Sequence, residues 1–226
     1  MNSKTRFKGY HHPKEIMLLA VRWYLTYPLS YRMVEEMIDE RGTKVDHATI
    51  NRWVVFLSPI LEDQIRKRKR AVSKRWHMDE TYIKIKEEWF FYYRAVDDQG
   101  ATIDYYLSKA RNTKAAYQFL KKASQTHGIP DRINIDGSSA NKKAIKHFNA
   151  YNNPDNAIKI YSRKFCNQMI EQDHRFIKRL TRPMMNFKSF SANSTLKGME
   201  VCHMLRKKQV VTKLAAWREF YTLLQA

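Results

Sequence analysis

The spacing of the apolar residues changes at Arg75, and this change limits the folds that the chain can adopt. Before Arg75, apolar residues recur every three or four positions, which is the period of an amphipathic helix. After Arg75 they alternate with polar residues, as in a strand that has one buried face. The first part of the chain is therefore expected to be helical, and a β-sheet is expected to follow it.

The expected elements after the change of period mix strands with helices. Before Arg75, helices are expected at residues 15–24, 31–40 and 47–57. A three-stranded meander (76–86, 89–96, 101–108) then precedes a helix (113–126), a strand (132–136), a helix (141–150), a strand (157–161) and a long helix (167–180). Two last helices are expected near 194–211 and 214–224. This order predicts an α/β fold, with helices on the faces of a mixed five-stranded sheet, preceded by an all-α domain.

Two of the N-terminal helices form a candidate helix-turn-helix. Ser30 and Asp46 are good N-caps for its two helices, and Gly42 suits a left-handed position in the turn between them. The second helix exposes groups that can contact base edges or phosphates, namely His47, Thr49, Asn51 and Arg52. An ordinary three-helix packing unit with a polar outer face is the alternative interpretation.

The charge of the chain favours a polyanionic partner. Its 226 residues include 42 Lys and Arg against 22 Asp and Glu, so the formal charge at pH 7 is +20. Nucleic acid is the commonest partner of such a chain, although a ribosome-associated or merely very basic protein would look the same. Residues 64–75 form a cationic run without an acid, which ends in Lys74 and Arg75. Beside a helix-turn-helix, this run fits a linker that follows DNA.

The sequence shows no membrane segment and no signal-peptide layout. The apolar run at residues 16–21 is cut by Arg22 and is far shorter than the roughly 20 residues of a membrane span. The two cysteines, Cys166 and Cys202, cannot build a disulfide scaffold and indicate a reducing compartment. We therefore expect a cytoplasmic protein that does not contact a membrane.

Three carboxylates stand out because this basic chain has few acids. Asp79 lies in the first expected strand, Asp136 ends the fourth, and Glu171 lies in the first turns of the long helix. If the two strands are neighbours and the helix packs over their edge, the three carboxylates converge. Clustered carboxylates repel each other unless a cation joins them, and oxygen ligands suit Mg²⁺ or Mn²⁺. Taken singly, each acid has a structural explanation: a turn residue, a helix N-cap, and a surface pair with Arg175.

Other constellations are weaker. Glu171 and His174 form an E-x-x-H pair, but di-iron bundles need two such helices and further glutamates. The cysteines and histidines lack zinc spacing, and no phosphate-binding P-loop motif is present.

The blocks around the three acids resemble the catalytic blocks of DDE transposases. They read WHMDETYIKIK, NIDGSSAN and NQMIEQDHRFIKRL, and Lys178 follows Glu171 by seven residues. The stretches AVRWYLTYPLSYRMVEEMIDERG, VDHATINRWV, YRAVDDQG and RPMMNFKSF are similar to insertion-sequence family six. The resemblance extends from about Phe7 to Gln209.

This resemblance implies an RNase H-like catalytic domain with Asp79, Asp136 and Glu171 as metal ligands. It also implies that the helix-turn-helix recognises the terminal inverted repeats of a bacterial element. The family cleaves phosphodiesters at the 3′ ends of the element, and the freed 3′-hydroxyl attacks target DNA. On this basis we divide the chain into a helix-turn-helix domain (1–62), a basic linker (63–75), a catalytic domain (76–188) and C-terminal helices (189–226).

The leading hypothesis is therefore a DNA transposase that depends on Mg²⁺ or Mn²⁺ and acts on double-stranded DNA near the nucleoid. Arg175, Lys178 and Arg179 are expected to hold terminal phosphates, although they could form a plain basic helix surface. Because two ends must be held together, we expect a homodimer or a higher homo-oligomer. The alternatives are a catalytically inactive DNA-binding regulator of the element and an RNase H-like nuclease without transfer activity.

Overall fold

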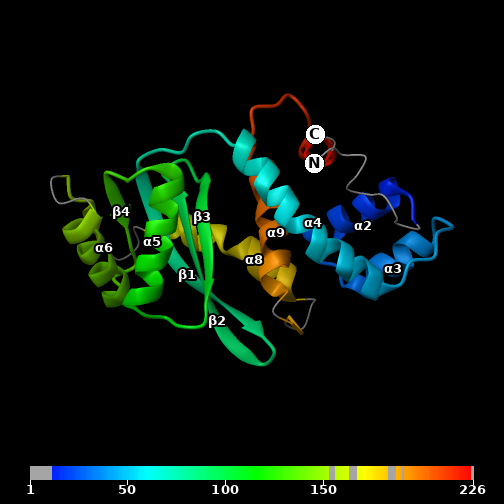
Figure 1. The fold of residues 1–226 in the computed structure, drawn as a ribbon, viewed down its shortest axis with the longest axis horizontal. Helices are drawn as coiled ribbons and strands as arrows, with labels where there is room; N and C mark the ends of the chain where they lie inside the picture. The colour runs from blue at the N-terminus through cyan, green and yellow to red at the C-terminus, as the bar shows by residue number, and fades with distance from the viewer. Residues whose placement is uncertain (1–11, 153–155, 163–166, 183–186, 190, 225–226) are drawn as a thin grey trace. The chain divides into compact units, whose positions relative to one another are not determined.

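The computed structural model describes residues 12–152, 156–162, 167–182, 187–189 and 191–224 of the chain (Figure 1). The chain divides into two compact units, and each is described separately. A helical unit combines Met1–Arg70 with Phe176–Ala226, and a sheet unit consists of Ala71–Arg175. No helix in the described ranges has both the length and the apolar composition that a membrane span requires.

The helical unit is built from both ends of the sequence. Its helices are α2 (Lys14–Thr26), α3 (Tyr31–Asp39), α4 (His47–Arg68), α8 (Arg175–Thr181, whose first residue belongs to the sheet unit), α9 (Ala192–Arg206) and α10 (Ala216–Thr222). Helix α4 packs against α9 and also contacts α2 and α3. The expected caps are confirmed, because Ser30 Oγ accepts from Met33 N, and Asp46 accepts from the amides of Ala48 and Thr49. Gly42 has a φ of +75° in the turn between α3 and α4.

Helix α4 is longer than the sequence pattern predicted. We expected it to end near residue 57 and a linker to occupy 63–75, but the helix continues to Arg68 with Pro59 inside it. The reason is that its apolar stripe continues through Leu57, Leu61 and Ile65, all fully buried, and α9 packs along this helix. About half of the expected basic linker is therefore helical.

Gly198 allows α9 to approach its neighbours closely. A Cβ atom at this position would lie under 3.0 Å from side-chain atoms of Leu25 in α2 and Ser58 in α4. Contacts this short do not occur between ordinary side chains, so a larger residue would push the helices apart. The N-terminal helices and α9 thus share one close-packed interface.

The sheet unit contains the predicted mixed sheet of five strands. Its elements are β1 (Arg75–Ile85), β2 (Glu88–Asp97), β3 (Thr102–Ser108), α5 (Thr113–His127), β4 (Arg132–Asn134), α6 (Ser139–Asn152), β5 (Lys159–Tyr161) and α7 (Gln168–Asp173). The strand order is β3-β2-β1-β4-β5. The first three strands are antiparallel, and β4 and β5 run parallel to β1. The sheet and its helices confirm the expected RNase H-like class.

The two faces of β1 meet different helices. Trp76 and Met78 point into the apolar core that α5 and α6 form on one face, with Phe119 and Ile145 among its members (Figure 1). Helix α7 contacts β1 and β2. Because successive strand residues point to opposite faces, Asp79 lies on the face away from that core.

The long helix expected at residues 167–180 is two helices. Helix α7 ends at Asp173, and α8 begins at Arg175. The break falls at His174, which keeps a right-handed backbone conformation but whose amide donates to both Ile170 O and Gln172 O. The α-helical bond from His174 N to Ile170 O is kept at 2.9 Å, so the two helices are separated at this single residue.

Candidate active site

Asp79 lies near the middle of the longest strand and is almost buried. It is 9% exposed, and it is directly opposite Arg94 of β2 in the antiparallel register. One carboxylate oxygen, Oδ2, lies 3.7 Å from Nδ1 of His174. A carboxylate in this position loses most of its hydration, so its charged form is disfavoured unless a positive charge is near.

Asp136 follows β4 at the carboxyl end of that strand. Its side chain is exposed, and Oδ1 accepts a hydrogen bond from Ser138 N at 3.0 Å. Gly137 has a φ of +96°, a conformation that glycine adopts without strain, and it turns the chain into α6. Because β4 pairs with β1 in parallel through Arg75↔Arg132 to His77↔Asn134, Asp136 and Asp79 lie two residues beyond the last pair of their strands.

Glu171 is an exposed residue of α7, the helix that contacts β1. Asn167 precedes this helix, and its carbonyl accepts from Glu171 N. The buried side chain of Asn167 donates from Nδ2 to Met78 O at 3.0 Å. The start of the helix that carries Glu171 is therefore attached to the residue before Asp79.

A second asparagine attaches the other acid-bearing segment to β1. Asn141, fully buried in α6, donates from Nδ2 to Glu80 Oε2 at 3.0 Å. Arg111 donates from Nε to the other oxygen of Glu80. As expected from strand alternation, Glu80 faces away from Asp79. Residues 78 and 80, which flank Asp79, thus hold the segments that carry Glu171 and Asp136.

The three acids share one electrostatic environment. The pKa of Asp79 is raised from 3.8 to about 7, first by burial and then by the negative charges of Glu80, Asp136 and Glu171. In the described part of the chain, however, no three His, Cys, Asp or Glu side chains are placed so that they could hold a metal ion. The negative charges of Asp136 and Glu171 therefore act on Asp79, while their convergence on a shared metal ion stays a prediction.

The chemistry of these donors fits a divalent cation of the Mg²⁺ type. All three predicted ligands supply carboxylate oxygens, which hard cations prefer. The raised pKa of Asp79 shows that negative charge at this point is poorly compensated by the protein. A cation would favour the ionised form of each carboxylate and remove the repulsion.

A buried ion pair fixes α7 against the sheet. Arg94 is fully buried, and its Nη2 lies 2.7 Å from Oδ2 of Asp173. Asp173, two residues after Glu171 on the same helix, thus has a structural partner of its own. Buried pairs of this kind are costly to break, because removing one partner leaves a charge in the interior.

His174 and the two asparagines were not predicted as parts of the site. The E-x-x-H spacing of Glu171 and His174 was visible in the sequence, and three-residue spacing places both on one side of a helix. The same spacing is found in di-iron bundles, but these need a second such helix and further glutamates. Asn141 and Asn167 lie within two of the quoted blocks, but their roles could not be predicted because they depend on contacts 61 and 89 residues away.

The candidate DNA contacts on α4 are partly engaged within the protein. His47 Nδ1 lies 3.0 Å from Glu35 Oε2, and Arg52 donates to Thr49 Oγ1 at 2.7 Å. Thr49 in turn donates to the capping Asp46, whereas Asn51 is half-buried. His47 and Arg52 remain exposed at the start of this helix, so they are accessible to a partner.

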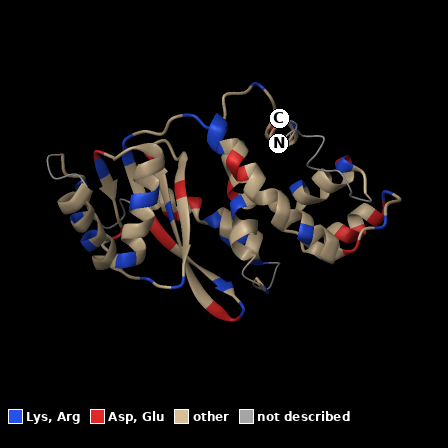
Figure 2. Ribbon diagram, in the orientation of Figure 1, with Lys and Arg blue, Asp and Glu red and all other residues tan. Residues whose placement is uncertain are grey.

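The basic residues that follow are partly neutralised. Arg66 pairs with Glu62, Lys67 with Asp63, and Arg68 with Glu219. Arg75 lies 3.5 Å from Asp98, and Lys74 is exposed. The side chains of Arg175, Lys178 and Arg179 are exposed on α8. Figure 2 shows further basic residues on α6, where Lys142, Lys143 and Lys146 are exposed and were not predicted as contacts.

The raised pKa of Asp79 predicts how the stability of the metal-free protein changes with pH. Between about pH 4 and pH 7 the folded chain binds more protons than the unfolded chain, so the free energy of unfolding falls as pH rises. Above pH 7, the free energy of unfolding is lower than at pH 4 by on the order of 4 kcal/mol. Asp79→Asn should remove this decline. Urea unfolding in EDTA at several pH values measures the free energy of unfolding of both proteins. The same pH dependence in the two proteins would contradict the prediction.

The sheet unit, with strand order β3-β2-β1-β4-β5, carries the three predicted ligands and is the candidate catalytic unit. Residues 73–209 match the family model of a DDE domain, DDE_Tnp_IS240. A transposase for insertion sequence-like element IS431mec from Staphylococcus aureus is 40% identical over 209 residues, which cover 90% of this chain and 88% of the relative. A transposase for insertion sequence element IS257 in transposon Tn4003, also from Staphylococcus aureus, is 39% identical with the same coverage.

Among solved structures, the HTLV-2 integrase catalytic core domain in complex with magnesium is similar with a TM-score of 0.46 and 19% identity. The match covers 67% of this chain and 98% of the integrase chain. The sequence matches establish the family by themselves. The chain belongs to the DDE transposases of insertion sequences, a family whose members use divalent metal ions.

Proposed function

We propose that this transposase binds the terminal inverted repeats of its element, cleaves at the 3′ ends and joins them to target DNA. The observation that carries the proposal is the electrostatic environment of Asp79, which includes Asp136 and Glu171. These acids come from three different elements, and two buried asparagines connect those elements beside Asp79. A structural role for each acid alone would not require this arrangement.

Asp79, Asp136 and Glu171 would hold Mg²⁺ or Mn²⁺ in the working complex. Such ions lower the pKa of an attacking water or hydroxyl and stabilise a leaving oxygen in phosphoryl transfer. The protein holds the three carboxylates in position through Asn141, Asn167 and the buried Arg94–Asp173 pair. Burial of Asp79 limits access of bulk water to this carboxylate, which strengthens its interaction with a cation.

Contacts to DNA would come from the exposed basic residues of both units. His47, Thr49, Asn51 and Arg52 are at the start of α4, where the N-terminal end of a helix also favours phosphate. Lys74, Arg75, Arg175, Lys178 and Arg179 would add phosphate contacts, and the lysines of α6 extend this set. We propose that the working form is a homodimer or larger assembly, which holds two element ends on bacterial DNA in the cytoplasm.

DNA binding should depend steeply on salt. If about eight phosphates are neutralised, the logarithm of the binding constant should fall with the logarithm of salt concentration with a slope near −7. Arg66, Lys67 and Arg68 form ion pairs within the protein that compete with phosphates. Replacing one of them by alanine should therefore change the slope less than replacing Lys178 or Arg179. Fluorescence anisotropy with duplex DNA measures the slope, and a value near zero would exclude an electrostatic interface.

A strand-transfer assay with cognate ends tests the proposed function. Joining of a supplied 3′-hydroxyl end to plasmid DNA would support a transposase. Specific binding of the inverted repeats without Mg²⁺-dependent joining would indicate an inactive regulator of the element. Cleavage without joining would indicate a nuclease. The Glu171→Gln and Asp136→Asn variants should lose joining while they retain end binding.

A further inference from the structure

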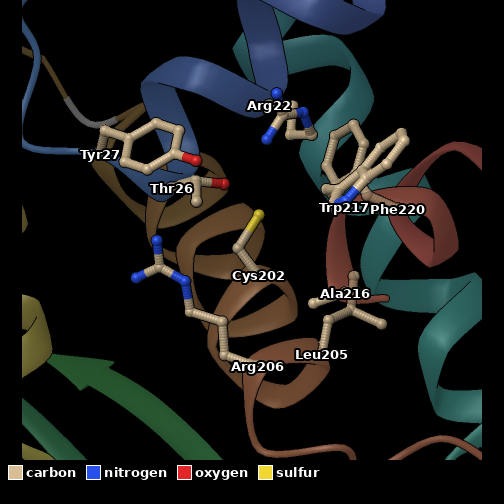
Figure 3. Close-up of a pocket in the computed structure, with 9 residues that line it drawn as sticks. All are labelled: Arg22, Thr26, Tyr27, Cys202, Leu205, Arg206, Ala216, Trp217 and Phe220. Carbon is tan, nitrogen blue, oxygen red and sulfur yellow. The ribbon is translucent and has the colours of Figure 1, made fainter. Parts of the chain in front are cut away.

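The helical unit contains a pocket that the proposed chemistry does not use. It lies among α2, α9 and α10 and has a volume of about 180 Å³ (Figure 3). One wall is polar and cationic and consists of Arg22, Tyr27 and Arg206. The other wall is apolar and consists of Leu205, Trp217 and Phe220. The pocket is therefore amphiphilic.

The cationic wall faces no acid among the described residues that line the pocket. Arg22 donates from Nε to the Tyr221 hydroxyl at 3.0 Å, and Arg206 lies 5.6 Å from the centre of the Tyr27 ring. Aromatic contacts orient a guanidinium but do not neutralise it, so the wall attracts an anion.

The apolar wall offers a flat aromatic surface that solvent reaches. Trp217 is 51% exposed, whereas Phe220 behind it is buried. Trp217 and Phe220 lie on the side of the pocket across from Tyr27 (Figure 3). A large aromatic side chain that stays half exposed at the edge of a pocket is suited to stack on a planar ligand.

A ligand that satisfies both walls carries a negative charge and a planar ring at short separation. A simple anion would leave the tryptophan unused, and an apolar ligand would bury the charges of two guanidinium groups without a balancing negative charge. A nucleotide has a phosphate next to a flat base, and bases stack on aromatic side chains with little dependence on sequence. A paired base is not available for this, because it is already stacked in the duplex.

We propose that this pocket binds one unpaired nucleotide of the DNA substrate, with its phosphate at Arg22 and Arg206 and its base against Trp217. The proposal rests on the proposed function, because that function supplies DNA ends with unpaired strands. It adds a contact that lies outside the catalytic unit and outside the helix-turn-helix.

The test compares single-stranded with duplex DNA in the full-length chain that carries Asp79→Asn, so that cleavage cannot interfere. A short oligodeoxythymidylate and a blunt duplex of similar charge serve as probes in fluorescence anisotropy. Trp217→Ala should weaken binding of the single strand about tenfold, since one stacked base is lost. Binding of the duplex should not change, because this substitution removes no charge. Arg206→Gln should weaken binding of the single strand as well.

Trp89→Ala is the matched control, because Trp89 is 59% exposed but lies on β2 of the catalytic unit. It should leave binding of the single strand unchanged. Equal affinity of wild-type and Trp217→Ala proteins for the single strand would overturn the proposal, as would an equal loss for the duplex. Either result would leave the proposed function standing, because joining of ends is measured separately. Circular dichroism confirms that each variant is folded.

Discussion

Asp79→Asn is expected to reduce both strand cleavage and strand transfer by at least about 1,000-fold. The substitution preserves size and removes the charge of the most buried of the three proposed metal ligands. Because asparagine oxygen is a weaker ligand for hard cations, the pKa of the attacking group would no longer be lowered. A gel assay with labelled element ends and plasmid target measures both steps.

The same variant should bind element ends with unchanged affinity. It should also be more stable than the wild-type protein in EDTA above pH 7, because the repulsion from Glu80, Asp136 and Glu171 is removed. Loss of activity together with gain of stability separates a chemical defect from misfolding. Asp131→Asn is the control, since Asp131 is exposed just before β4. Strand transfer by Asp79→Asn near the wild-type rate would contradict the proposed role of this residue.

Asp173→Ala is expected to destabilise the catalytic unit by about 3–5 kcal/mol. The substitution removes a partner of Arg94, whose side chain is fully buried, at a bond of 2.7 Å. A guanidinium cannot release its proton to escape this penalty, since its pKa is too high. Hydrogen exchange followed by mass spectrometry, in increasing urea, should show earlier exchange in β2 and α7.

Asp63→Ala provides a matched comparison on an exposed ion pair. Asp63 lies 2.7 Å from Lys67, but both side chains are more than half exposed. This pair should contribute less than about 1 kcal/mol, because solvent already stabilises both charges. Similar losses of unfolding free energy for Asp63→Ala and Asp173→Ala would show that burial does not strengthen the Arg94–Asp173 pair.

The sequence pattern predicted the sheet well because local alternation and local turns determine its strands. The change of period at Arg75 located β1, and the caps at Ser30 and Asp46 located the starts of α3 and α4. The end of α4 was missed because packing against α9, far away in the sequence, stabilises the extra turns. Periodicity within a short window contains no information about that partner.

The three acids could be selected from the sequence because carboxylates are scarce in a chain of this charge and because their blocks resemble a known family. The connections among them could not be predicted. The side chains of Asn141 and Asn167 have roles only after β1, α6 and α7 have assembled. Likewise, nothing in the sequence around Arg94 indicates that it is buried opposite Asp79.

The helical unit is assembled from both ends of the chain, and this limits what a shortened copy of the gene can produce. The core beneath α4 is completed by α9, and Gly198 is matched to Leu25 and Ser58. A fragment that stops before α9 would expose the apolar stripe of α4 to water and would aggregate or be degraded. Premature stop codons should therefore silence the element completely, instead of releasing a fragment that occupies its ends and blocks intact transposases.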